Sequence, residues 1–66
     1  QLTAAQAAVL NLATDPAGIT AQQAAAGTGM ILAEAKKTIR FLIQQFLVEE
    51  HDGRYHLQPH LTQALQ

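Results

Sequence analysis

The chain has 66 residues, of which 48% are hydrophobic, but alanine supplies 13 of these and aromatic residues make up only 5% of the chain. So short a chain holds one domain at most, because it buries only about 60% of the surface that its unfolded form exposes. Cysteine is absent and the net charge is −1, which excludes disulfides, thiolate metal sites and a polybasic tail. No apolar run is long enough to span a bilayer. We therefore expect one cytoplasmic domain over residues 1–66, with no membrane partner. It opens at Gln1 and its only methionine is Met30, which predicts a fragment of a larger protein.

The first predicted helix begins at Ala4. Thr3 can cap its first turn, and Gln6, three residues later, can bond back to Thr3. One apolar stripe follows at helical spacing, formed by Ala5, Val9 and Leu12. The helix must end before Pro16, because the residue preceding a proline is pushed out of the helical region.

Two further helices are predicted. Ile19 forms a short extended segment, and Thr20 with Gln23 repeats the capping signal, which predicts a helix from Ala21 to Ala26. The triplet Gly27-Thr28-Gly29 then breaks the chain. A third helix is expected from Leu32 to Gln45. Its apolar stripe follows the same helical spacing and consists of Ala35, Ile39, Leu42 and Phe46.

From Leu47 onwards the spacing of apolar residues changes from the helical period of about 3.6 towards the strand period of about 2, which predicts a β-hairpin. Two short strands flank Asp52-Gly53, a dipeptide suited to a type I′ turn because both of its residues tolerate positive φ. The turn sets the register and pairs Glu50 with Tyr55, Glu49 with His56 and Val48 with Leu57. Pro59 stops the second strand, and residues 60–66 have the pattern of the start of a further helix. The expected fold class is mainly α with a small β-hairpin, that is, α+β.

Metal binding and catalysis are not expected. His51, His56 and His60 lie near three acidic residues, but a hairpin is expected to place His51 and His56 on faces that do not converge. A Glu49–His56 pair across the strands is the ordinary explanation of this cluster. The chain also lacks serine, cysteine and a glycine-rich phosphate loop. We therefore expect no metal, no cofactor and no enzymatic activity.

The stretch from Ile19 to Leu57 resembles a winged helix-turn-helix domain. The resemblance lies in the segment 19–25, the Thr28-Gly29-Met30 turn, the spacing of Ile39 and Leu42 ahead of Leu47, and the wing tip at residues 52–55. It implies a three-helix fold in which the third helix enters the DNA major groove and the hairpin serves as a wing. The same fold also serves proteins that bind only other proteins.

The four cations fall on the two elements that the resemblance assigns to DNA. Lys36, Lys37 and Arg40 lie on the third helix, away from its apolar stripe, and Arg54 lies beside the wing turn. Lys36, Lys37 and Arg54 are expected to contact phosphates. Gln22, Gln23 and Thr28 can add hydrogen bonds to phosphates or base edges. This predicts duplex DNA binding within a transcription regulator or DNA-processing protein, associated with the nucleoid. The simpler alternative is a solvated helix face that balances the acids.

Several positions depart from the family pattern and suggest a rival function. Ile31-Leu32 stands where the family often places a polar cap, and Phe46 stands where a glycine is common. Phe46, Ile43 and Met30 can fill core volume left by small alanines. The rival interpretation is an exposed apolar patch, formed by Ile31, Leu32, Phe41 and Ile43, that binds a partner protein. A second copy of the chain or another domain of the parent protein would then be the partner.

Overall fold

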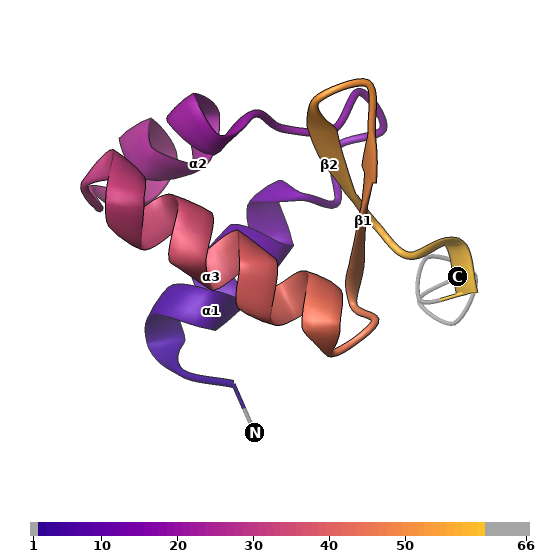
Figure 1. The fold of residues 1–66 in the computed structure, drawn as a ribbon, viewed down its shortest axis with the longest axis horizontal. Helices are drawn as coiled ribbons and strands as arrows, with labels where there is room; N and C mark the ends of the chain where they lie inside the picture. The colour runs from indigo at the N-terminus through magenta and orange to yellow at the C-terminus, as the bar shows by residue number, and fades with distance from the viewer. Residues whose placement is uncertain (1, 61–66) are drawn as a thin grey trace.

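The fold is three helices followed by one antiparallel hairpin, in a winged helix-like arrangement (Figure 1). It is seen in a computed structural model that describes residues 2–60. The elements are α1 (Ala4–Leu12), α2 (Ala21–Thr28), α3 (Leu32–Gln44), β1 (Val48–His51) and β2 (Arg54–Leu57). This confirms the predicted α+β class. Residues 61–66, where the start of a further helix is predicted, lie outside the described part.

The helix starts confirm the two capping signals. Thr3 and Thr20 each accept a hydrogen bond from the backbone N–H three residues later, and the glutamine at that position bonds back to the threonine N–H. The predicted end of α2 at Ala26 is wrong. The helix continues through Gly27 to Thr28 and is capped by Gly29, which adopts φ 79°. Only this second glycine breaks the chain, because a left-handed residue is what closes a helix of this kind. At the end of α3, the helix stops one residue before the predicted Gln45.

The hairpin has the predicted register and turn. Val48 pairs with Leu57, Glu49 with His56 and Glu50 with Tyr55. Asp52 and Gly53 both have positive φ, at 54° and 78°, as the type I′ turn requires. The short extended segment at Ile19 pairs with the outer edge of β2, where it exchanges two backbone hydrogen bonds with Tyr55 of 3.0 and 2.7 Å. The wing is thereby fixed to the α1–α2 connection.

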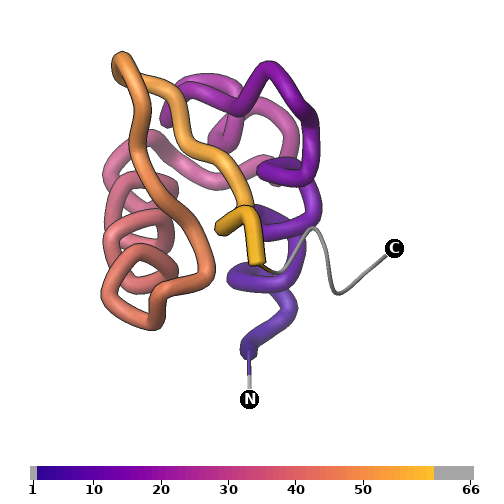
Figure 2. The backbone as a smooth tube through the Cα atoms, turned by 90° about the vertical axis from the view of Figure 1, so that its right-hand side faces the viewer, coloured from indigo at the N-terminus to yellow at the C-terminus, as the bar shows by residue number. Residues whose placement is uncertain are grey.

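A single core joins all the elements. Its largest fully buried side chains are Leu42, Val9 and Val48, from α3, α1 and β1. The remaining buried apolar residues are Ala13, Ile19, Ala21, Ala24, Ala35, Ile39 and Leu57. Alanine at four of these positions lets the helix backbones approach closely. Viewed from the side of the hairpin, the wing crosses in front of the helices, with α3 on one side and α1 on the other (Figure 2).

The packing of the wing against the α1–α2 connection explains why position 18 is a glycine. Gly18 adopts φ 75°, and a Cβ at this position would lie 2.8 Å from the ring of His56. Only glycine therefore fits between the α1–α2 turn and the wing. At the other end of β2, the N–H of Leu57 donates to the carbonyl of Ala13 at 3.0 Å. Within residues 2–60, no helix has both the length and the apolar character needed to cross a membrane.

Phe46 does not fill the core, and that prediction is wrong. It lies in the turn between α3 and β1 with φ 59°, and 74% of its surface is exposed. The turn needs a left-handed residue to send the chain from α3 into β1, and this backbone directs the side chain outward. Met30, by contrast, is half-buried against the core as expected.

Candidate nucleic-acid interface

The outer face of α3 gathers three of the four cations. Lys36, Lys37 and Arg40 are all exposed, as predicted, while the opposite face of the helix is buried. Ala33 and Gln44 lie on the same exposed face, one helical repeat before and after the cations. Sequence reasoning missed Gln44. Its position four residues after Arg40 was the signal that could have identified it.

These cations have no acidic partner within the part of the chain that the structure describes. All lysine, arginine, aspartate and glutamate residues lie within residues 2–60, and the single ion pair found there joins Glu49 to His51 at 3.3 Å. Glu34 lies in the first turn of α3, where it interacts favourably with the positive end of the helix dipole. The basic face is therefore available to an anionic ligand.

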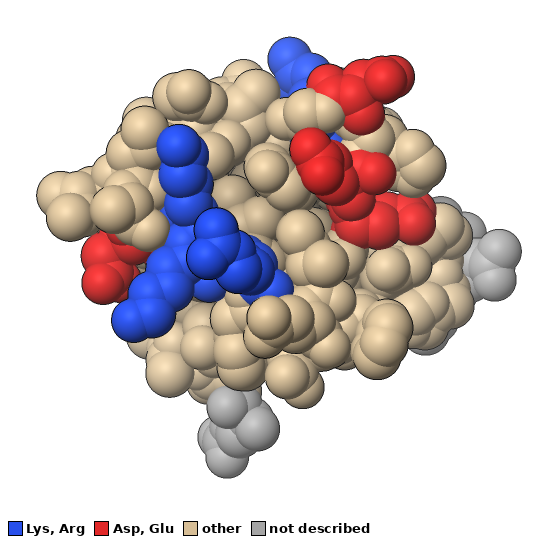
Figure 3. Space-filling view, viewed as in Figure 1, with Lys and Arg blue, Asp and Glu red and all other residues tan. Residues whose placement is uncertain are grey.

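The wing has the opposite charge. Glu49, Glu50 and Asp52 lie on or next to β1, against the single cation Arg54. Arg54 donates from Nη1 to the carbonyl of Gly18 at 3.2 Å, so its guanidinium braces the wing against the α1–α2 connection. Figure 3 shows basic side chains over α3 and acidic side chains over the wing on the same face of the molecule. Arg54 stands apart from the α3 cations, so the structure does not join the four cations into one patch.

A groove of about 170 Å³ separates α3 from the wing. It is lined by Lys36, Ile39, Arg40, Ile43, Glu50 and Tyr55. The α3 side of the groove is thus basic and apolar, and the wing side holds the carboxylate of Glu50 and the phenol of Tyr55. Lys37 lies at the far edge of the same exposed face, beside a hollow that it shares with Glu34 and residues of α1.

The polar residues of α2 differ in their exposure and in whether their side chains are already hydrogen-bonded. Gln22 and Gln23 are both exposed, but the side-chain oxygen of Gln23 accepts from the N–H of Thr20 at 2.9 Å. Thr28 is half-buried and its hydroxyl donates to the carbonyl of Ala24 at 2.7 Å. Gln22 is therefore the α2 side chain with the most freedom to meet a ligand.

The exposed apolar residues only partly match the predicted patch. Ile31, Leu32 and Ile43 are exposed, at 71%, 39% and 36%. Phe41 is not exposed with them, and that prediction is wrong. It is half-buried and packs against the core, because its position on α3 turns it towards α1. Phe46 is the other large exposed apolar residue among those described.

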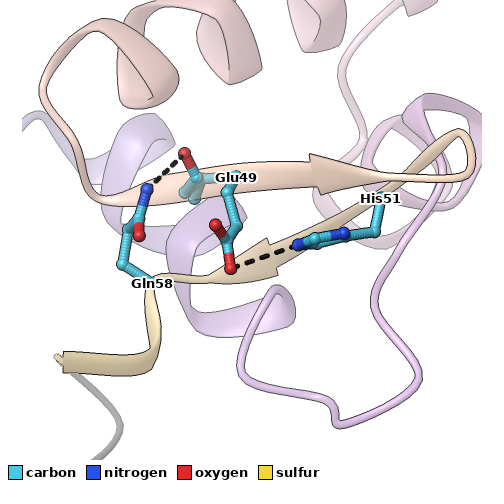
Figure 4. Close-up of polar contacts among 4 residues, drawn as sticks. Glu49, His51 and Gln58 are labelled. Carbon is cyan, nitrogen blue, oxygen red and sulfur yellow. Dashed lines mark hydrogen bonds and ion pairs between the residues drawn. The ribbon is translucent and has the colours of Figure 1, made fainter.

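The outer face of the wing brings two histidines together, contrary to expectation. His51 and His56 lie on one face with ring centroids 5.8 Å apart, because diagonal neighbours in a hairpin point to the same side. Glu49 stands opposite His56 across the strands, as predicted, and Figure 4 shows that its ion pair is with His51 along the same strand. The same view shows Gln58, whose side chain donates to the carbonyl of Val48 at 3.5 Å.

A hollow of about 410 Å³ lies beside this cluster. It is bounded by Asp15 and Pro16 on one side and by Glu49, His51 and His56 on the other. In the described part of the chain, no three histidine, aspartate or glutamate side chains are arranged to hold a metal ion.

Comparisons with protein-family models, with curated proteins and with solved structures find no match for this chain. The function of the α3 face is therefore inferred from its own residues and from the winged helix-like arrangement of the fold.

Proposed function

We propose that this domain binds duplex DNA through the exposed face of α3, as part of a transcription regulator or DNA-processing protein. The observation that supports this best is the unpaired cation set Lys36, Lys37 and Arg40 on one exposed helical face. An α-helix fits the major groove, where lysine and arginine can meet phosphates and guanine edges.

The neighbouring residues on α3 suit the same role. Ala33 is small and lets the start of the helix approach the groove closely. Gln44 presents an amide, which can bond adenine in a bidentate manner. Gln22 on α2 is exposed and can reach a phosphate beside the groove. The wing adds little attraction, because its three carboxylates outnumber Arg54.

Binding should be weak and strongly dependent on salt. Neutralising about three phosphates gives a slope of about −2.7 in log K against log salt, so affinity should fall about 40-fold between about 50 and about 200 mM salt. The measurement is a fluorescence anisotropy titration of the chain with labelled duplex DNA across that salt series.

Variants locate the binding surface. Lys36→Ala, Lys37→Ala and Arg40→Ala should each weaken binding and lower the salt slope by about 1. Arg54→Ala is the matched control, since it also removes one positive charge but lies among the acids of the wing, and it should change affinity little. An absence of binding at low salt, or equal losses from all four variants, would contradict the proposal.

A protein-interaction module is the second candidate. It is favoured by the exposure of Ile31 and Leu32 at the start of α3 and of Ile43 near its end, since exposed apolar side chains on a small domain mark protein contacts.

A further inference from the structure

DNA binding leaves the acidic wing unexplained. The wing carries Glu49, Glu50 and Asp52, and Figure 3 shows acidic side chains on the same face of the molecule as basic ones. Of the three, Glu50 lines the groove that also holds Lys36 and Arg40. A phosphate backbone that approached the α3 cations would also approach these carboxylates, which repel it. A surface with one basic half and one acidic half is instead complementary to a surface of the same kind.

The two halves do not neutralise one another within one chain. Lys36 and Arg40 line the same groove as Glu50, yet among residues 2–60 no lysine or arginine nitrogen comes within 4.0 Å of a carboxylate. Both sets therefore remain free to pair with charges on another molecule.

The strip between the two halves is apolar. Ile39, Ile43 and Tyr55 line the groove, and Ile43 remains 36% exposed. Leu32, also exposed, lies on the same flank of α3, eleven residues and three turns before Ile43. Stable protein interfaces have this anatomy, with an apolar centre and a polar rim.

We propose that this face binds a second copy of the chain in a symmetric dimer. A twofold axis that runs along the groove turns α3 of one copy onto the wing of the other, and does so twice because the contact is self-complementary. Lys36 and Arg40 of each copy then meet Glu50 of the other copy. The two Ile43 side chains meet near the axis and exclude water from the charged pairs.

The chain has enough exposed surface for a dimer contact of standard size. The chain exposes 4412 Å², so a standard interface of about 800 Å² per partner would cover about a fifth of it. The dimer does not depend on DNA binding, but it covers the same cations, so self-association and DNA binding exclude one another.

The test is a charge swap followed by sedimentation equilibrium of the 66-residue chain, from about 10 µM to about 1 mM, the range that suits a small interface. Lys36→Glu and Glu50→Lys should each weaken self-association about tenfold, because each places like charges opposite one another at two symmetric positions. The double variant Lys36→Glu/Glu50→Lys should restore it, because the pair is re-formed with its signs exchanged. Glu34→Lys is the matched control; it makes the same charge change on the flank of α3 that faces α1, and should have no effect.

DNA titrations of the same variants separate this inference from the proposed function. Glu50→Lys should weaken the dimer and strengthen DNA binding, whereas the double variant should regain the dimer without regaining DNA affinity. A dimer that responds to the swap while no variant binds DNA would support the dimer and refute the DNA proposal.

The dimer proposal is overturned if the wild-type chain stays monomeric at about 1 mM, or if Glu50→Lys leaves self-association unchanged. All substituted positions are exposed, and circular dichroism verifies that each variant is folded.

Discussion

The two helices of the helix-turn-helix are held in place in different ways. α2 satisfies both of its ends through local sequence, with a Thr20–Gln23 capping box at its start and Gly29 in a left-handed conformation at its end. α3 differs from it at both ends. Its N-cap is Ile31, which makes no side-chain hydrogen bond. Its end is closed by a left-handed residue that is not glycine, Phe46 at φ 59°, with the N–H groups of Phe46 and Leu47 donating to the carbonyls of Ile43 and Leu42.

This difference shows that packing, and not local sequence, stabilises α3. Four of its residues are buried, Ala35, Thr38, Ile39 and Leu42, whereas α2 buries two alanines. Departures from local rules concentrate where a protein meets its ligands. The unusual start and end of α3 support the proposal that its outer face binds another molecule.

The largest expected effect concerns the packing of α3. Leu42→Ala should lower the free energy of unfolding by about 2–5 kcal/mol, because Leu42 is fully buried and its truncation leaves a cavity. Leu32→Ala, the same change at an exposed position of the same helix, should cost about 1 kcal/mol or less. Urea denaturation followed by circular dichroism measures both. Similar losses at the two positions would mean that the core contacts of Leu42 do not hold α3.

The next effect contrasts the two left-handed residues. Gly29→Ala should destabilise the fold by about 1 kcal/mol, because an alanine at φ 79° places Cβ too close to the following carbonyl. Phe46→Gly should do the opposite and stabilise it by about 1 kcal/mol, because it relieves the same strain and gives up little buried surface.

Phe46→Asn is the control for the second change, since asparagine tolerates the left-handed region and should recover part of the gain. Thermal unfolding of the three variants measures these shifts. A loss of stability in Phe46→Gly would show that the aromatic ring contributes to folding despite its exposure.

The same contrast explains what the sequence could and could not predict. The capping boxes of α1 and α2 and the Asp52-Gly53 turn are local signals, so helix starts and hairpin register were predictable. The face of Phe41 and the outward position of Phe46 depend on how α3 packs against α1 and turns into β1, which is tertiary information. In the candidate site, the exposure of Lys36, Lys37 and Arg40 followed from helical periodicity. The separation of Arg54 from them did not, because it depends on the placement of the wing.

The smallest expected effect tests the open start of α3. Glu34 already occupies the third position of the helix, so Ile31→Thr would complete a capping box of the kind seen at Thr20. This change should raise the free energy of unfolding by about 0.5–1 kcal/mol, while Thr20→Ala should lower it by a similar amount. Ile31→Ala is the control, because it removes the exposed side chain without supplying a cap. If Ile31→Thr stabilises the chain and Ile31→Ala does not, threonine supports the fold better than isoleucine at this position. The isoleucine, which is 71% exposed, would then serve contact with another molecule. If neither change alters stability, the start of α3 is frayed and no such conclusion holds.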